Sequence, residues 1–280
     1  MEAGKTNHCA VEDVQVTVIT PTYNQGTFIG DTIRSVVSQT YKNIEYIIVD
    51  NESDDGTEQI VRRFIVQYDN IKYFREKDAG QADALNKGFD LAAGSIVCWL
   101  NSDDYYFDHS VIGRIVQLFQ ENEDVDVIYG DGFCSDKDGN ILYSHRINQK
   151  HVSMKYFNIL CPILQPSSFW RKNEIRLRND YPHSFDWLFF REMYLKKKKF
   201  YYLNQSLSVY RMYDSNKTGT DSWIRRKELF DVVRNHIGPY HIIAAGFYLI
   251  YLSYRFSAIT GLTGVANTVK KISKWVGEKV

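Results

Sequence analysis

Cysteine is scarce in this chain, and its spacing excludes one class of protein. The sequence has four cysteines in 280 residues, at positions 9, 98, 134 and 161. No two of them form a CxxC pair, so the pattern does not indicate a disulfide framework. We therefore expect a protein of a reducing compartment.

The chain also lacks the charge, leader and glycine patterns of several other classes. Its 34 basic residues balance its 34 acidic residues, so we expect no nucleic-acid partner. A basic stretch followed by an apolar one is missing at the start, so we do not expect a secretory signal peptide. Neither GxGxxG nor a P-loop pattern follows the first predicted strand, which disfavours a dinucleotide-binding fold and a P-loop enzyme.

What the sequence does contain is a regular alternation of strand and helix patterns. The apolar content of 44% supports a large core, and the length suits one large domain with or without an appendage. Short runs rich in apolar residues, the first of them mostly β-branched, predict strands at 14–20, 44–49, 71–74 and 97–100. Helical spacing predicts helices near 28–37, 57–65 and 85–91. This order predicts a parallel sheet covered by helices, with polar turns meeting at one edge.

The stretch 97–104 points most directly to chemistry. Four apolar residues run into a polar cluster that ends in Asp103 and Asp104. Open α/β sheets bind ligands at the carboxyl ends of their strands, where two adjacent carboxylates repel unless a cation or hydrogen-bond donors separate them. A divalent cation that also holds phosphate oxygens would fit. The alternative is an acidic loop that caps the next helix, since Asp is a good N-cap.

Several segments together resemble the family 2 glycosyltransferases. They are residues 16–24, 35–41, 49–57, 78–88 and 100–104, followed by 165–171, which is similar to the acceptor-side segment of bacterial members. The likeness covers about residues 14–218. It implies an α/β protein with the GT-A fold, a mostly parallel sheet flanked by helices, here with a C-terminal helical tail. We accordingly expect a glycosyltransferase domain over residues 1–220 and a helical tail over 221–280.

The first half of such enzymes binds a nucleotide-sugar. By this resemblance Pro21 and Tyr23 line the base pocket, with the ring of Tyr23 against the base. Asp50 would accept a hydrogen bond from the base, since an ionised carboxylate only accepts. Asp78 is expected near the nucleotide or the sugar. From the residues alone, two alternatives stay open: Tyr23 as a packed aromatic at a strand end, and Asp50 as a cap of a helix or turn.

The resemblance also implies a metal site. Asn101 and Asp103 occupy the two acidic positions of the family's DxD motif, with Asn101 as a departure. Asp103 is therefore the expected ligand of Mg²⁺ or Mn²⁺, supported by Asn101 or Asp104, and the cation would bridge the diphosphate. Arg211 lies where relatives have Arg-x-His and is expected to pair with phosphate, or else to be a surface arginine. Tyr213 stands in place of that His.

Transfer also requires a base that takes the proton of the acceptor hydroxyl. The family places an acid at the start of a helix in its second half, and Asp186 matches that position. Asp180 is the second candidate, and a simple helix cap is the alternative for Asp186. A single displacement at the anomeric carbon inverts the configuration, as the resemblance implies.

The tail carries a different signal. Residues 237–262 form an apolar, Tyr-rich run that is nearly long enough to span a bilayer but is interrupted by Gly, Pro, Ser and Arg255. Tyr and Arg side chains favour an interfacial position, and the lysines and Trp275 of the last helix add charge and an anchor. We therefore expect contact with the inner face of the cell membrane from the cytoplasm. Packing on the catalytic domain or on a second subunit is the alternative.

The expected activity is that of an inverting glycosyltransferase. It would move a hexose or N-acetylhexosamine from a nucleotide-sugar, UDP-linked by expectation, to a glycan or lipid-linked acceptor in bacterial surface polysaccharide assembly. A catalytically silent glycan-binding or scaffold protein on the same fold stays open because of Asn101 and Tyr213. A sugar nucleotidyltransferase should have a basic, Gly-rich first loop, whereas residues 21–26 contain no Lys or Arg.

Overall fold

The computed structural model describes residues 14–158, 161–213, 216, 227–228, 230–232 and 234. The first half alternates strand and helix: β1 (Val16–Thr22), α1 (Ile29–Val37), β2 (Ile44–Asp50), α2 (Thr57–Ile65), β3 (Ile71–Arg75), α3 (Gln81–Leu91) and β4 (Ile96–Trp99). The second half is mixed: β5 (Tyr105–Tyr106), α4 (Val111–Glu121), β6 (Val127–Ser135), β7 (Ile141–His145), η2 (Gln149–His151), α5 (Met154–Phe157), η3 (Gln165–Ser167), β8 (Ser168–Arg171), α6 (Phe185–Leu195) and β9 (Phe200–Arg211).

Local sequence explains the first half. β1 and β2 are rich in β-branched residues and buried at every position, as expected for parallel strands with both faces covered. In α1 the buried residues Ile29, Ile33 and Val36 recur at helical spacing and form one apolar face. The predicted strands and helices of residues 14–100 are therefore all present.

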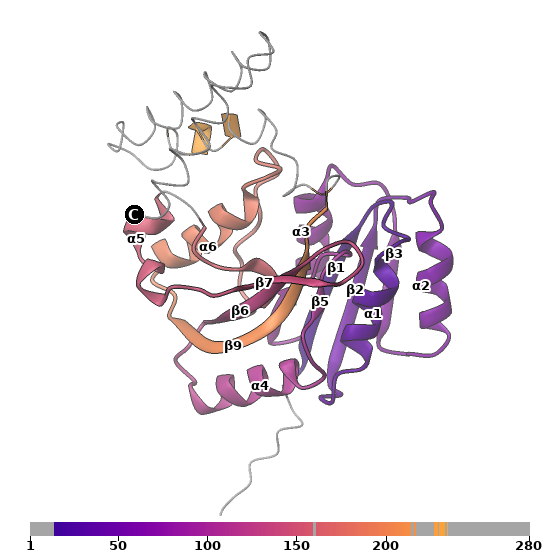
Figure 1. The fold of residues 1–280 in the computed structure, drawn as a ribbon, viewed down its shortest axis with the longest axis horizontal. Helices are drawn as coiled ribbons and strands as arrows, with labels where there is room; N and C mark the ends of the chain where they lie inside the picture. Colours follow the sequence, from indigo (N-terminus) through magenta and orange to yellow (C-terminus); the bar gives the residue numbers. More distant parts are fainter. Residues whose placement is uncertain are drawn as a thin grey trace, which may run out of the picture.

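One sheet runs through both halves of the chain. Its strand order is β3-β2-β1-β4-β8-β6-β9-β5, with β7 paired to β6. The first four strands are parallel, as predicted, whereas β8 runs antiparallel to both β4 and β6. The chain winds from β1 toward β3 on one side and returns to place β4 on the other side of β1. The carboxyl ends of β1 and β4 therefore form the crevice where such sheets bind ligands. In Figure 1 the parallel strands lie on the right with α1 and α2, and α5 and α6 lie on the left.

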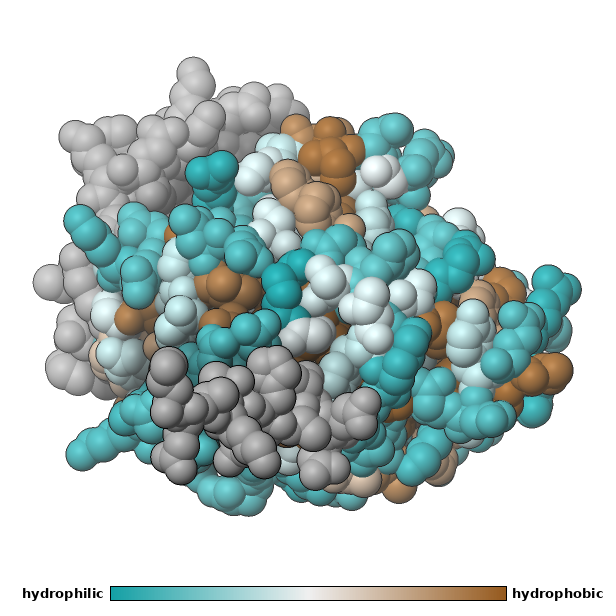
Figure 2. All heavy atoms as spheres, turned by 90° about the horizontal axis from the view of Figure 1, so that it is seen from below, coloured by the Kyte–Doolittle hydropathy of each residue, from teal (hydrophilic) through white to brown (hydrophobic). Residues whose placement is uncertain are grey.

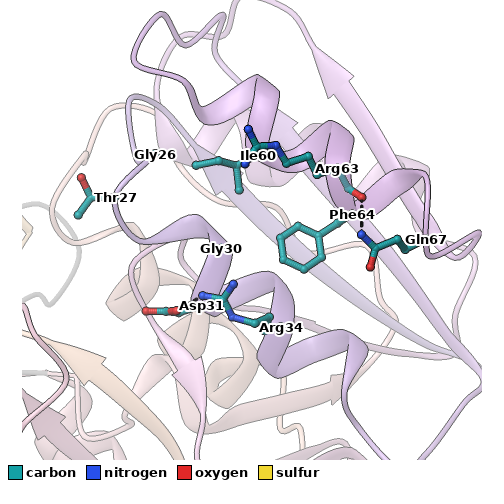
Figure 3. Close-up of a pocket in the computed structure, with 9 residues that line it drawn as sticks. All are labelled: Gly26, Thr27, Gly30, Asp31, Arg34, Ile60, Arg63, Phe64 and Gln67. Carbon is teal, nitrogen blue, oxygen red and sulfur yellow. Dashed lines mark hydrogen bonds and ion pairs between the residues drawn. The ribbon is translucent and has the colours of Figure 1, made fainter.

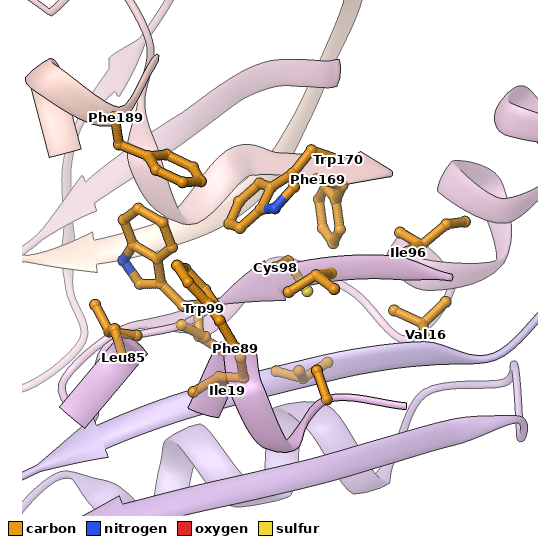
Figure 4. Close-up of a cluster of buried hydrophobic side chains, with 14 of the residues drawn as sticks. Val16, Ile19, Leu85, Phe89, Ile96, Cys98, Trp99, Phe169, Trp170 and Phe189 are labelled. Atoms are coloured by element: carbon orange, nitrogen blue, oxygen red, sulfur yellow. The ribbon is translucent and has the colours of Figure 1, made fainter. Parts of the chain in front are cut away.

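An aromatic cluster joins the two halves. Trp99 of β4 contacts Trp170 of β8 with a ring-centroid distance of 5.2 Å, and Trp170 contacts Phe189 of α6 at 5.1 Å. Phe89 of α3 stacks on Phe189 at 5.7 Å, so three layers of the fold meet here (Figure 4). Such pairs add about 0.5–1.5 kcal/mol each beyond the burial of their area. The cluster fixes α6 against the sheet.

At the opposite end of the strands lies a buried carboxylate. Glu45 of β2 is only 4% exposed and accepts hydrogen bonds from Thr17 (2.6 Å), Lys72 (2.7 Å) and the Ala93 N–H (2.7 Å). Burial by itself would raise the pKa of Glu45, but the hydrogen bonds from these three partners lower it below its ordinary value. The charge on Glu45 therefore stabilises the folded state.

The tail prediction falls mostly outside the described residues. The run 237–262 and the lysines after it lie beyond them, and in the part of the chain that the structure covers no helix is long and apolar enough to cross a membrane. Residues 227, 228, 230–232 and 234 are helical, in agreement with the helical character expected of the tail. Figure 2 shows one face of the molecule, where the described surface is mostly hydrophilic with separate hydrophobic groups.

Candidate active site

A cleft of about 600 Å³ opens at the carboxyl ends of β1 and β4. Both halves of the chain line it, because the turns after the parallel strands form one wall and residues of β7, α6 and β9 form the other. Seven of the eight predicted site residues lie on its walls: Pro21, Tyr23, Asp78, Asn101, Asp103, Asp186 and Arg211. Asp50 is the exception.

The turn after β1 presents Pro21 and Tyr23 to the cleft. Asn24 adopts a left-handed conformation with φ of 52°, which Asn tolerates better than most residues, and its N–H donates to the Ser53 hydroxyl at 2.9 Å. Its side-chain oxygen accepts the Asp54 N–H at 3.0 Å, which ties this turn to the one after β2. Tyr23 is 58% exposed at the cleft. Packing in the protein interior therefore does not account for it.

Asp50 ends β2 but is fully buried and is not part of the described cleft lining. Its Oδ1 accepts the Ser53 N–H (3.0 Å) and hydroxyl (2.5 Å), and its Oδ2 accepts the Tyr73 hydroxyl at 2.5 Å. Burial and the bond to Asp50 raise the pKa of Tyr73. The carboxylate thus holds the turn after β2 against β3, which is close to the capping alternative. Its contact with a base stays a prediction.

Asp78 lies at the cleft just before α3. Its N–H donates to the Asn51 side chain at 2.9 Å, and its Oδ1 accepts the Gly80 N–H at 2.8 Å. Burial raises the pKa of Asp78 above its ordinary value. Gly80 has a φ of 120°, a conformation that L side chains rarely adopt, so glycine is required to bend the chain into α3.

The turn after β4 is fixed on two sides. Thr32 of α1 donates its hydroxyl to the carbonyl oxygens of Ser102 (2.9 Å) and Asp104 (2.7 Å). Asn101 donates to Asp104 at 3.0 Å and to Gln165 at 3.3 Å, and it accepts from Gln81 at 2.8 Å. The side-chain amide of Asn101 therefore connects α3, the turn after β4 and the acceptor-side segment at Gln165.

The two neighbouring carboxylates of this turn have different surroundings. Asp104 is buried, and its two oxygens accept the Arg211 N–H at 3.2 Å and the Asn101 amide at 3.0 Å. Burial, and then the charge of Asp103, raise the pKa of Asp104 well above its ordinary value. Asp103 is half-buried at the cleft, and its Oδ2 accepts the Tyr213 hydroxyl at 2.9 Å. Both carboxylates line the cleft, and Asp103 is the more exposed of the two.

Arg211, at the end of β9, is 5% exposed, so the alternative of a surface arginine is wrong. One terminal nitrogen donates to Asp31 at 2.6 Å and the other to the carbonyl oxygen of Asp103 at 3.0 Å. The guanidinium also lies over the rings of Phe28 (5.1 Å) and Tyr105 (4.8 Å). It therefore clamps the turn after β4 to α1. Pairing with phosphate stays a prediction.

The donor set fits a cation that is shared with a ligand, not one held by protein alone. Among the described residues, no group of three or more His, Cys, Asp or Glu side chains is placed to hold a metal. Asp104 already has both oxygens in hydrogen bonds, which leaves Asp103 as the main carboxylate. Mg²⁺ commonly uses one or two carboxylates together with substrate phosphates, so one carboxylate on the cleft wall is compatible with it.

Asp186 lies on the opposite wall, in the first turn of α6. Its Oδ1 accepts the Trp187 N–H at 2.8 Å, which directs the carboxylate back toward the start of the helix. Cys161 lies nearby, where burial and then the charge of Asp186 raise the pKa of the thiol well above its ordinary value. Asp180 is exposed, pairs with Arg178 at 2.6 Å and is not part of the described cleft lining. The geometry favours Asp186.

Most of the other cleft residues escaped the sequence analysis, and two of them carry polar groups at the ends of elements. His145, on the second wall, ends β7, and burial lowers the pKa of its imidazole, which favours the neutral form. Gln81 opens α3 and donates to Asn101. The segment of β7 carries no recognisable motif, so only the pairing of β7 with β6 could have placed His145 here.

A second hollow of about 360 Å³ lies between α1 and α2, away from the predicted residues (Figure 3). Its lining includes Arg34 and Arg63, and Asp31 on its wall pairs with both Arg34 and Arg211. Asp31 therefore touches both this hollow and the arginine that clamps the active-site turn.

Sequence comparison gives a consistent result. The profile of the family described as Glycosyl transferase family 2 matches residues 17–211. An uncharacterised glycosyltransferase of Rickettsia typhi is 30% identical over 218 residues, which are 73% of this chain and 66% of that protein. Glycosyltransferase GlyG of Streptococcus pneumoniae is 27% identical over 86% of this chain and 85% of its own length. The matched segments span 66%, 22% and 33% of the first three relatives.

Solved structures agree on the fold. TarS of S. aureus, residues 1–349 in complex with UDP-GlcNAc, superposes with a TM-score of 0.63 at 19% identity, over 87% of this chain and 73% of that one. Mannosyltransferase PcManGT of Pyrobaculum calidifontis, in complex with GDP-Man and Mn²⁺, superposes with a TM-score of 0.60 at 19% identity. The match covers 94% of this chain and 80% of that one. The sheet and its cleft therefore define a GT-A fold. The chain belongs to glycosyl transferase family 2, which confirms the resemblance seen in the sequence.

Proposed function

We propose that the protein transfers a sugar from a nucleotide-sugar, UDP-linked, to an acceptor hydroxyl with inversion at the anomeric carbon. One observation carries the proposal: Asp103 and Asp186, from opposite halves of the chain, line the same cleft. The former would hold the leaving diphosphate and the latter would activate the acceptor. The ligands of the neighbours, UDP-GlcNAc in TarS and GDP-Man with Mn²⁺ in PcManGT, support a nucleotide-sugar in this cleft.

The first wall binds the donor in this proposal. The exposed ring of Tyr23 stacks on the base beside Pro21, and Asp78 accepts a hydrogen bond from the ribose or the sugar. Asp103, with Asn101 in support, is the ligand of Mg²⁺ or Mn²⁺, which when bound supplies positive charge next to the diphosphate. Arg211 and Thr32 hold the turn that presents Asp103, so the carboxylate stays oriented without closure of the protein.

The second wall activates the acceptor. Asp186 takes the proton of the acceptor hydroxyl as its oxygen forms a bond to the anomeric carbon and the bond from that carbon to the diphosphate oxygen breaks. The nucleoside diphosphate leaves with the electron pair, and the configuration inverts because attack and departure occur on opposite faces. The N-terminus of α6 favours negative charge on Asp186, which a base requires.

The proposal for the acceptor and the cellular setting rests on the sequence. We infer a hexose or N-acetylhexosamine donor, a glycan or lipid-linked acceptor, and a role in bacterial surface polysaccharide assembly at the inner face of the membrane. The apolar, Tyr-rich run 237–262 supports the membrane contact. A silent glycan-binding protein has less support, because both the expected metal ligand and the expected base are present on the cleft walls.

Asp103→Ala tests the proposal. UDP binding is measured by calorimetry with and without Mn²⁺, and we expect the variant to lose the Mn²⁺-dependent part of the binding. Asp138→Ala serves as the control, since Asp138 is an exposed turn residue outside the cleft. If Asp103→Ala binds UDP with the same Mn²⁺ dependence as the unaltered protein, the assignment of the metal ligand is wrong.

A further inference from the structure

The N-cap residue of α6 makes no side-chain capping hydrogen bond, although the Asp186 carboxylate accepts the Trp187 N–H within the first turn. The first N–H groups of any helix have no partner inside the helix, and Ser or Asp side chains usually accept from them. Ser184 is at the N-cap position, but its side chain makes no capping hydrogen bond to the helix. Since Asp186 lies in the first turn, the direction of its carboxylate depends on how the chain enters α6. Contacts at residues 183 and 184 therefore act on the direction of Asp186 together with its own hydrogen bond to the Trp187 N–H.

A carboxylate from the tail occupies this position. Glu228 is 6% exposed, and its two oxygens accept the His183 N–H at 2.9 and 3.2 Å. Ser184 also donates to it, through both its N–H and its hydroxyl. The two residues just before the helix are therefore held by a carboxylate that lies 45 positions after His183 in the chain.

The tail segment that carries Glu228 is packed against the domain. Val232, one helical turn further on, has no exposed surface and belongs to the hydrophobic core, and Phe230 packs against that core. Lys227 and Asp231 of the same segment face each other at 3.9 Å and are partly exposed. One side of this short helix therefore holds Glu228 in place, while the other side faces away from the core.

We propose that Glu228 is a positioning residue for Asp186: the tail closes the start of α6 and thereby sets the direction in which the base enters the cleft. This inference rests on the proposed function of Asp186. Glu228 does not touch the reacting atoms, since it is not part of the described cleft lining. It also lies beyond residue 211, where the match to the family profile ends, so family comparison does not assign it.

In this arrangement the tail also has a structural role at the active site. The helix that carries Glu228 precedes the run 237–262 for which membrane contact is expected, and it holds the chain where it enters α6, so the geometry of the base depends on a correctly docked tail. Loss of the Glu228 carboxylate would remove these hydrogen bonds, and Glu228 is not part of the described cleft lining. A loss of turnover with unchanged nucleotide binding is the result that this coupling predicts.

Glu228→Ala and Glu228→Gln test the proposal in the full-length protein, with Asp231→Asn as the matched control on the same helix. Hydrogen exchange of a peptide covering residues 183–187 reports the cap without any ligand. We expect about tenfold faster exchange in Glu228→Ala, in line with the loss of a helix cap, and no change in the control. Glu228→Gln keeps the size and one accepting oxygen, so it should show a smaller effect and serves if the alanine variant folds poorly.

Turnover is measured as hydrolysis of whichever of UDP-GlcNAc, UDP-glucose, UDP-galactose and GDP-mannose the unaltered protein cleaves fastest. We expect kcat to fall by roughly 10–100-fold in Glu228→Ala, the scale of a base displaced by about 1 Å, with UDP affinity unchanged. A purely structural role would lower both together or neither.

The outcomes separate the inference from the proposed function. Unchanged exchange at 183–187, or unchanged kcat in spite of faster exchange, overturns the positioning role while Asp186→Asn remains inactive. If Asp186→Asn retains full turnover, the proposed base is wrong and the positioning role falls with it. Faster exchange together with a selective loss of kcat in Glu228→Ala, an inactive Asp186→Asn and a normal Asp231→Asn supports both.

Discussion

Replacing Arg211 by methionine tests whether its guanidinium holds the active-site turn or is reserved for a ligand. Methionine keeps the unbranched stem against Phe28 and Tyr105 but removes the bonds to Asp31 and to the Asp103 carbonyl. Arg34→Met is the matched control, because Arg34 pairs with the same Asp31 from the exposed side. The two variants therefore differ mainly in the burial of the arginine that is lost.

The magnitude follows from these contacts. Hydrogen bonds to charged groups contribute about 1.5–3 kcal/mol each, and Arg211 makes two from its guanidinium. This stabilisation is offset in part. Burying a charge is costly, and the buried Nε of Arg211 has no hydrogen-bond partner among the described residues. We expect a net loss of about 3 kcal/mol in the free energy of unfolding for Arg211→Met. Exposed pairs contribute about 0–1 kcal/mol, which is the expectation for Arg34→Met.

Thermal unfolding, followed by tryptophan fluorescence, measures the difference. In chains of this size 1 kcal/mol corresponds to a shift of about 2–4 °C, so Arg211→Met should lower the midpoint by about 6–12 °C and Arg34→Met by less than about 4 °C. Equal shifts in the two variants would refute the clamp. A variant Arg211→Met with an unchanged midpoint but no UDP binding would instead assign the guanidinium to the diphosphate.

Three further predictions concern the base, the tail and acid stability. Asp186→Asn should lower turnover by roughly 10²–10⁴ with UDP affinity unchanged, whereas Asp180→Asn should be normal; the reverse pattern would move the role to Asp180. Deleting residues 237–280 should shift the protein from membrane pellets to the soluble fraction, and a full-length chain already found in the soluble fraction would make the tail a packing or oligomer element instead. Glu45→Gln should lower the thermal midpoint most near neutral pH. Because the folded pKa of Glu45 lies below 4.5, its stabilisation is present above pH 4.5 and is lost as the pH falls through that folded value, so a constant difference down to pH 3 would contradict it.

The sequence could predict the elements whose signal is local. Short runs rich in apolar residues and helical spacing placed every strand and helix of residues 14–100, and the rule for parallel sheets placed the turn with Asp103 at the binding edge. Family resemblance then selected Asp186 from the acids of the second half, and the structure places it at the cleft while Asp180 pairs with Arg178 outside it. These inferences needed no knowledge of distant partners.

What the sequence could not predict is which polar groups already have partners inside the protein. Asp50 looked available for a base, yet Ser53 and Tyr73 occupy both of its oxygens. Arg211 looked like a surface or phosphate-binding residue, yet it pairs with Asp31, 180 positions away in the sequence. Such pairings depend on how the strands are ordered in the sheet, and a pattern read along the chain does not contain that order.

The uninterrupted sheet has a consequence for inhibition. β4 and β8 are hydrogen-bonded neighbours, so the two cleft walls rest on one continuous sheet and cannot move apart by a hinge motion. A bisubstrate compound that links a uridine diphosphate mimic to an acceptor sugar would meet a gap whose width is set before it arrives. Little of its binding energy would then be spent on ordering the protein, and the best linker length should be sharply defined.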